Sequence, residues 1–152
     1  MPAQSSFPIA AAIMFLSGIG IPIFAALNGG LGRGLDHPVG AIVVTFAVGL
    51  AVALVALAFV GGPPPAARFA AVPPQYYLGA LFMVFYGLAI TYFGPRIGVG
   101  NAVFFVLLGQ LVAAATIDHF GLFGAIHFAL TPRRALGIAV MALGVWLAKR
   151  TA

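Results

Sequence analysis

Residues 39–60 form a continuous apolar run that contains no ionisable side chain. A helix needs about 20 predominantly apolar residues to cross the hydrocarbon core of a bilayer, and this run meets that length. Soluble domains carry roughly 25% charged residues, whereas only 6% of the residues in this chain are charged. This small number of charges cannot cover the surface of a water-soluble globule. Lipid is therefore the expected solvent for most of the chain.

Other apolar runs share this character, and short polar, Gly-rich or Pro-rich segments separate them. The predicted spans are residues 7–27, 39–60, 75–93, 101–117 and 132–147, within a single membrane domain, 1–152. The predicted fold class is therefore all-α integral membrane, a bundle of five transmembrane helices. The last span is the shortest of the five.

Local signals predict where two of these helices begin. Pro38 suits the first turn of the second helix, with Asp36 or His37 near its cap. Thr131 and Pro132 form a cap and a first-turn proline in the same way. We therefore expect helices to start at or just after each of these prolines.

Helix-breaking residues predict ends and connections. Pro22 is expected to break the first helix, and Asn28 is a candidate left-handed C-cap because two glycines follow it. Gly94 and Pro95 form a stop signal for the third helix. The Pro-rich segment 61–74 is predicted to be stiff and extended.

The apolar stretch 120–130 is too short to cross a bilayer, so it is expected at the membrane interface or as a re-entrant segment.

Positive charge in short loops sets the orientation of membrane helices, and here it is almost balanced. With five spans, one side holds three basic residues and the other four: Arg68, Arg133 and Arg134 against Arg33, Arg96, Lys149 and Arg150. One interpretation is dual insertion, with an inverted copy completing the inverted-repeat architecture of secondary transporters. The other is a single orientation set by other features. We expect an oligomer on either interpretation.

Several kinds of site are disfavoured by the composition. The chain has no cysteine, which excludes disulfides and thiolate metal sites. His127 lies eight residues beyond His119, which is not a recognisable metal spacing. Scattered basic residues argue against nucleic-acid binding, and Asp36 and Asp118 are the only acids. We therefore expect no catalytic residues, no metal, no cofactor and no enzymatic activity.

Polar side chains within membrane spans are costly, so each one requires an explanation. Gln110, Asn28, Tyr86 and Asn101 are candidates for contact with a small-molecule substrate. The alternatives are an interhelical hydrogen bond for Gln110, helix-terminal roles for Asn28 and Asn101, and packing against helices and lipid for Tyr86. Asp118 is a candidate for ion coupling; the alternatives are an ion pair with an interfacial arginine or a solvated carboxylate.

Several segments of the chain carry a family pattern. They are Gly109-Gln110-Leu111, Ile117-Asp118-His119-Phe120-Gly121-Leu122-Phe123-Gly124, the end of the first span from Pro22 through Asn28 to Leu31, and Phe46 with Gly49. Together they resemble the YdcZ-like family, small members of the drug/metabolite transporter superfamily. The resemblance implies a five-helix unit in the bacterial inner (plasma) membrane, an exporter role, and pairing as an inverted homodimer or with a paired homologue. Asn28, Gln110 and Asp118 fall on the family pattern, so the resemblance also favours a functional role for these three residues.

One departure from the wider superfamily is clear. Its four-helix multidrug members exchange protons for cations at a glutamate in the first helix, but this chain contains no glutamate. Proton antiport by that route is therefore not expected. The leading hypothesis is a small secondary transporter or exporter of an organic solute, working as a dimer by alternating access. The alternative is a non-transporting membrane subunit or scaffold of a larger complex.

Overall fold

The computed structural model describes residues 7–148, and helices are the regular elements found within that range. In chain order they are α1 (Phe7–Gly34), α2 (Pro38–Phe59), α3 (Ala66–Ala71), η1 (Pro74–Leu78), α4 (Gly79–Ile97), α5 (Val99–Phe120), η2 (Leu122–Gly124) and α6 (Pro132–Ala148). The all-α prediction is therefore confirmed for the described residues.

Four helical segments are long and apolar enough to cross a membrane: Phe7–Gly34, Pro38–Phe59, Pro74–Ile97 and Val99–Phe120. The helix predicted as the fifth span, α6, is present with 17 residues. At 1.5 Å per residue that length covers about 25 Å, less than the roughly 30 Å of a hydrocarbon core. The structure thus supports a multi-pass membrane protein with four span-length helices.

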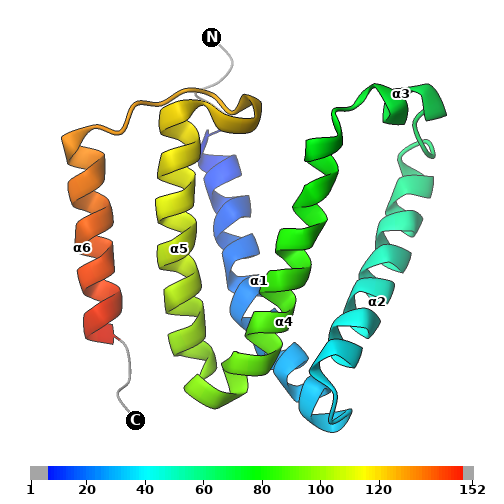
Figure 1. Cartoon of the computed structure of the whole chain (residues 1–152), viewed down its shortest axis with the longest axis horizontal. Coiled ribbons are helices and arrows are strands. Elements are labelled where there is room, and N and C mark those ends of the chain that lie inside the picture. Colours follow the sequence, from blue (N-terminus) through cyan, green and yellow to red (C-terminus); the bar gives the residue numbers. More distant parts are fainter. Residues whose placement is uncertain (1–6, 149–152) are drawn as a thin grey trace. The chain divides into compact units, whose positions relative to one another are not determined.

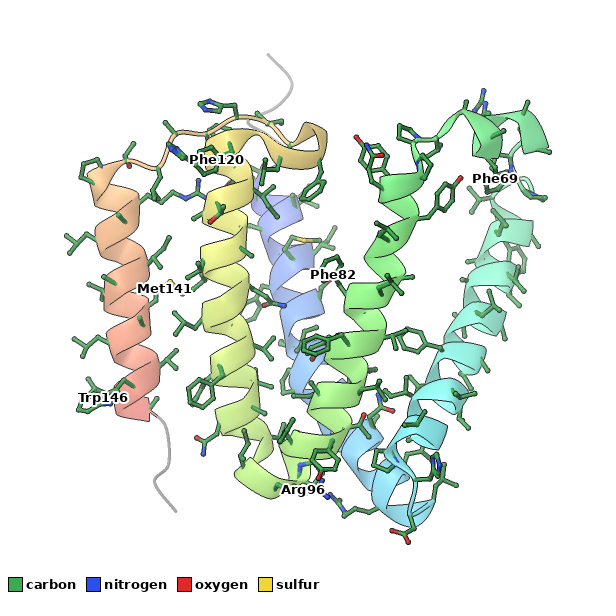
Figure 2. The ribbon with its side chains drawn as sticks, viewed as in Figure 1. Phe69, Phe82, Arg96, Phe120, Met141 and Trp146 are labelled. Carbon is green, nitrogen blue, oxygen red and sulfur yellow. The ribbon has the colours of Figure 1, made fainter. Side chains whose placement is uncertain are left out.

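Large apolar side chains cover the outside of these helices. Phe82 is 74% exposed and Met141 is 43% exposed, and Figure 2 shows both projecting from their helices. Water would penalise such surfaces by roughly 25 cal/mol per Å², whereas lipid tails solvate them. The pattern is that of helices that face lipid.

Two compact units divide the chain, Met1–Arg96 and Ile97–Ala152. We call them the N-terminal unit and the C-terminal unit and describe each by itself. The core of the N-terminal unit lies where α1, α2 and α4 converge, at the end that holds the α1–α2 turn (Figure 1). The buried residues of this core are Ala25, Asn28, Gly29, Gly32, Ala41, Ile42, Gly87, Ile90, Thr91 and Gly94.

The α1–α2 turn has the chemistry that the sequence predicts. His37 is the N-cap of α2, and its Nδ1 atom accepts a 2.8 Å hydrogen bond from the backbone N–H of Gly40. Pro38 occupies the first turn, where a missing N–H costs nothing. This predicted helix start is therefore confirmed.

The predicted end of α1 is wrong. The helix runs through Pro22 without interruption and continues past Asn28 to Gly34, so Asn28 is not a C-cap. Glycine costs about 1 kcal/mol relative to alanine inside a helix, but here it permits close packing. A Cβ added at Gly32 would lie 2.8 Å from Thr91 Cγ2 of α4. Packing against α4 therefore offsets the weak helix propensity of this segment.

Two other predicted boundaries also need correction. Gly94 and Pro95 do not stop α4, which ends at Ile97, and Gly98 follows it in a positive-φ conformation (φ 86°). The segment 61–74 is not simply extended, because it contains the short helix α3.

In the C-terminal unit, a loop joins α5 to α6 across one end of both helices (Figure 1). The backbone N–H of Phe128 donates to the carbonyl of Asp118 at 2.9 Å, and that of Leu130 donates to His119 Nδ1 at 3.0 Å. These bonds hold the loop over the end of α5, so it is not re-entrant. Thr131 caps α6, since its hydroxyl accepts from the backbone N–H of Arg134 at 3.2 Å, as predicted.

Candidate functional site

A polar pair lies inside the core of the N-terminal unit. The hydroxyl of Thr45 on α2 donates to Oδ1 of Asn28 on α1 at 2.5 Å. Asn28 is only 3% exposed, and Thr45 is the one polar side chain of α2. A buried amide in an apolar environment is stable only when it is hydrogen-bonded. Thr45 therefore explains how α1 tolerates an asparagine at this depth.

The same pair borders a small hollow of about 230 Å³. Its lining is otherwise apolar: Phe24 and Leu27 of α1, with Val44 and Val48 of α2. In the described part of the chain, no residue accepts a hydrogen bond from the Asn28 amide N–H group. The hollow thus offers an apolar wall and an amide donor beside it, an arrangement suited to a small solute with one acceptor group.

Tyr86 of α4 joins this site through an aromatic contact. Its ring stacks on that of Phe24, with centroids 5.9 Å apart and planes 19° apart. Phe24 and Asn28 are one helical turn apart on α1, so they share a face. The Tyr86 hydroxyl is buried and has no partner among residues 7–148. An unpaired hydroxyl in a low-dielectric environment costs roughly 1–3 kcal/mol, so Tyr86 is a polar group of this core that no described side chain satisfies.

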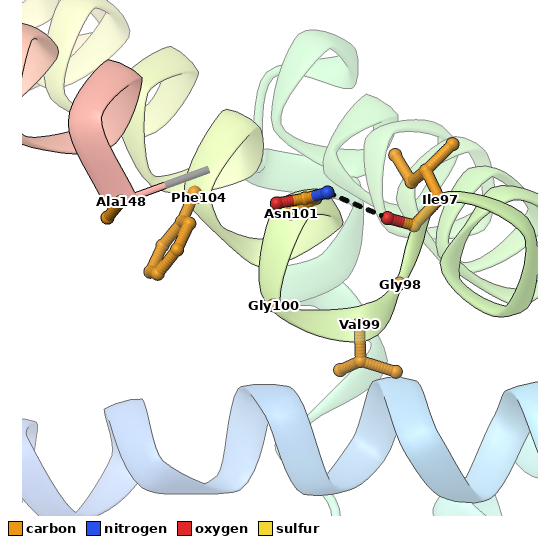
Figure 3. Close-up of a pocket in the computed structure, with 7 residues that line it drawn as sticks. All are labelled: Ile97, Gly98, Val99, Gly100, Asn101, Phe104 and Ala148. Carbon is orange, nitrogen blue, oxygen red and sulfur yellow. Dashed lines mark hydrogen bonds between the residues drawn. The ribbon is translucent and has the colours of Figure 1, made fainter. Parts of the chain in front are cut away.

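The two candidates on α5 lie in the C-terminal unit. Asn101 is in the first turn, but Gly98 is the N-cap residue, so the helix-start role predicted for Asn101 is not a capping role. The Asn101 amide donates to the Ile97 carbonyl at 2.9 Å. It lines a hollow of about 490 Å³ (Figure 3), together with Phe104, one turn further along α5, and Ala148 at the end of α6.

Gln110 does not join Asn101. The two are nine residues apart, which places them on opposite faces of α5 at 100° per residue and about 13.5 Å apart along its axis. The Gln110 side chain is exposed within its unit, and no described residue bonds to its amide. The structure therefore brings together Asn28 and Tyr86 in one unit, but it does not bring Gln110 and Asn101 to one site within the other.

Asp118 makes the ion pair with an arginine that was one of its predicted alternatives. An Arg134 nitrogen, Nη2, lies 2.6 Å from Asp118 Oδ2, with the side chains 36% and 31% exposed. The pair joins the end of α5 to the first turn of α6, beside the His119–loop bond. Its role in ion coupling remains a prediction.

Thr45 and Phe24 are the site residues that the sequence analysis missed. The signal for Thr45 was available, because it is the single hydroxyl in an otherwise apolar run. The signal for Phe24 was not, since it is one of fourteen phenylalanines and only its contact with Tyr86 singles it out.

Comparison with known proteins identifies the family. No curated protein and no solved structure matches the chain significantly. The family model described as "Putative inner membrane exporter, YdcZ" matches residues 9–147, nearly the whole chain. This match agrees with the apolar, span-length helices, which place the chain among multi-pass inner-membrane proteins. The protein belongs to the YdcZ family of inner-membrane proteins.

Proposed function

We propose that this protein is a small secondary transporter that exports an organic solute, and that the solute binds beside Asn28. The single observation that carries the proposal is the buried Asn28 amide, fixed by Thr45 and bordering a hollow on α1 and α2 whose other lining residues are apolar. Family membership supports the direction of transport, since the family is one of exporters.

The chemistry around the hollow suggests a class of solute. The Thr45 hydroxyl occupies the Asn28 carbonyl and leaves its N–H group available. If the amide is turned over, its carbonyl becomes the free group, because oxygen and nitrogen of an amide are nearly interchangeable in shape. Phe24 and Tyr86 offer aromatic faces. A small, uncharged or weakly polar molecule with an apolar body and one hydrogen-bonding group fits these features.

Alternating access by a dimer is the second part of the proposal. In this picture α6 acts as the fifth span and an inverted copy of the chain, or a paired homologue, completes the transport path. Two observations support it. The basic residues favour neither side of the membrane, and the exposed Gln110 amide, near the middle of α5, has no partner within its own unit. An unpaired amide in hydrocarbon is costly, so a partner surface or the solute is expected to meet it.

A flux assay tests the proposal. Purified protein is reconstituted into liposomes, and uptake of a panel of small cations, amino acids and neutral metabolites is measured. We expect at least one solute to be transported, with flux lowered by Asn28→Ala and by Gln110→Ala but not by Val43→Ala, a control on the exposed face of α2. If no solute binds or moves, or if the Asn28→Ala variant transports normally, the proposed site is wrong.

Topology reporters test the dimer. A reporter fused to the C-terminus is expected to give signal on both sides of the membrane. Signal from one side only, together with a stable complex with an unrelated membrane protein, would instead favour a scaffold subunit.

A further inference from the structure

The N-terminal unit contains a second, larger hollow at the end where α1 and α4 finish and α2 begins. Its volume is about 430 Å³. Unlike the hollow at Asn28, its wall carries charged side chains. It is lined by Gly32, Arg33, Asp36, Pro38, Thr91, Tyr92, Pro95 and Arg96.

Two guanidinium groups border this hollow without a carboxylate partner. Arg33 lies in the last turn of α1 and Arg96 in the last turn of α4. Across residues 7–148 the ion pair that forms is Asp118–Arg134. Arg33 and Arg96 therefore have no carboxylate partner, and neither of them pairs with Asp36. The hollow therefore has two positive charges and one negative charge on its wall.

The position of Arg96 is fixed by its neighbours. Its Nη1 atom donates to the Tyr92 carbonyl, and its guanidinium carbon lies 3.6 Å from the centroid of the Tyr92 ring. A guanidinium carries five N–H donors, so this contact leaves most of them available. A cation held on an aromatic ring with free donors is well suited to bind an oxyanion.

Thr91 provides an observation that is independent of charge. It is 3% exposed, and its buried hydroxyl has no hydrogen-bond partner in the part of the chain that the structure describes. A helical threonine or serine usually satisfies its hydroxyl on the carbonyl four residues earlier. Ser17 and Thr116 do so here, each at 2.9 Å, whereas Thr91 does not. Thr91 thus brings to the wall of a charged hollow a hydroxyl that no described residue satisfies, and an oxyanion oxygen can accept from it after a change of rotamer.

We propose that this hollow is a binding site for a phosphate-type oxyanion, with Arg33 and Arg96 supplying charge and the Thr91 hydroxyl supplying a hydrogen bond. Arginine forks match the paired oxygens of phosphate. The site lies at helix ends, the depth at which lipid headgroups meet a membrane protein. The ligand is therefore either a lipid phosphodiester or a soluble phosphate, and the site is separate from the solute site at Asn28.

A binding experiment distinguishes the two sources. Full-length protein is placed in nanodiscs of zwitterionic phosphatidylcholine, and binding of inorganic phosphate is measured by calorimetry. In a second arm, phosphatidylglycerol is titrated into the nanodiscs, and the lipid retained by the protein is measured by native mass spectrometry. A lipid site gives saturable binding in the second arm alone, and a soluble-phosphate site gives it in the first. Absence of saturable binding in both arms overturns the proposal.

Variants test whether the binding depends on this hollow. Arg33→Gln and Arg96→Gln are each expected to weaken binding about tenfold, since a charge-assisted hydrogen bond is lost. Thr91→Val keeps shape and charge and is expected to weaken it about fivefold through loss of one neutral hydrogen bond. Asp36→Asn removes the only negative charge on the wall and is expected to tighten binding.

Arg68→Gln is the matched control, since Arg68 is an exposed arginine of the same unit outside this hollow. It is expected to leave binding unchanged, and melting temperatures of all variants identify any that fail to fold. If Arg68→Gln weakens binding as much as Arg33→Gln does, or if folded Thr91→Val binds like the parent protein, then the anion meets general surface charge and the proposed site is wrong.

Discussion

The close approach of α1 to α4 gives the sharpest stability prediction, and Gly29→Ala is the change that tests it. A Cβ built at Gly29 would lie 2.9 Å from Pro95 Cγ and 3.5 Å from Pro95 Cδ. Carbon atoms in contact prefer separations of about 3.5–4.0 Å. The proline ring is stiff and part of α4, so it cannot turn aside as a flexible side chain would. The added methyl must therefore push the two helices apart.

The expected magnitude comes from two opposing effects. Overpacking of a tight interior typically costs about 1–3 kcal/mol, whereas replacing a helical glycine by alanine gains up to about 1 kcal/mol. Gly30→Ala is the matched control, because it has the same propensity gain and nothing lies within 4 Å of its added Cβ. We expect Gly29→Ala to be less stable than Gly30→Ala by about 1–3 kcal/mol.

The assay is reversible unfolding of the full-length protein in mixed micelles, with SDS as denaturant and helical circular dichroism as readout. Pro95→Ala in a double-mutant cycle with Gly29→Ala should recover most of the loss, because contacting residues couple. If Gly29→Ala is as stable as Gly30→Ala, or if the cycle shows no coupling to Pro95, then α1 and α4 do not pack as described.

Three further predictions concern the polar contacts. Thr45→Val should destabilise the protein by about 1 kcal/mol and weaken solute binding, because it leaves the Asn28 amide buried without its partner. Thr116→Val is the control, since it loses only a hydrogen bond within its own helix. It should not affect solute binding measured in parallel. Arg134→Gln should lower the free energy of unfolding by no more than about 1 kcal/mol, since the ion pair is partly exposed, and a larger loss would mean that the pair is more desolvated than it looks. His119→Phe should speed hydrogen exchange at the backbone N–H of Leu130, because that N–H donates to the His119 ring. Unchanged exchange would refute this hydrogen bond.

Helix starts were predictable because their chemistry is local. His37 with Pro38, and Thr131 with Pro132, carry the cap and the first-turn proline within a few residues, and the structure confirms both. The same local reasoning failed at Gly94, where a helix-stop signal lies inside α4. Pro95 of this signal lies against Gly29 of α1, which is far away in the sequence, and local propensity cannot reveal such a contact.

In the candidate site, too, local features were predictable from the sequence and contacts between helices were not. The cost of polar groups inside a span made Asn28 and Gln110 two of several candidates, and Gln110, in the middle of its span, is exposed within its unit. Asn28 is buried. Its partner Thr45 is 17 residues away on another helix, and only the packing of α1 on α2 identifies the pair. Helical periodicity alone, however, already separates Asn101 from Gln110, since nine residues turn a helix by 180°. The separation of these two residues is therefore predictable from the sequence.

The central claim is that the polar pair of the N-terminal unit faces a path that solutes enter from water. Because the chain has no native cysteine, a single engineered thiol reports on one position. Val48→Cys lies on the wall of the hollow beside the pair, whereas Val43→Cys lies on another face of α2, and a membrane-impermeant maleimide can be applied to each in intact proteoliposomes. We predict that the thiol at position 48 is labelled and is protected by a transported solute, while the thiol at position 43 stays unlabelled in lipid. Labelling of neither, or of position 43 alone, would contradict the claim.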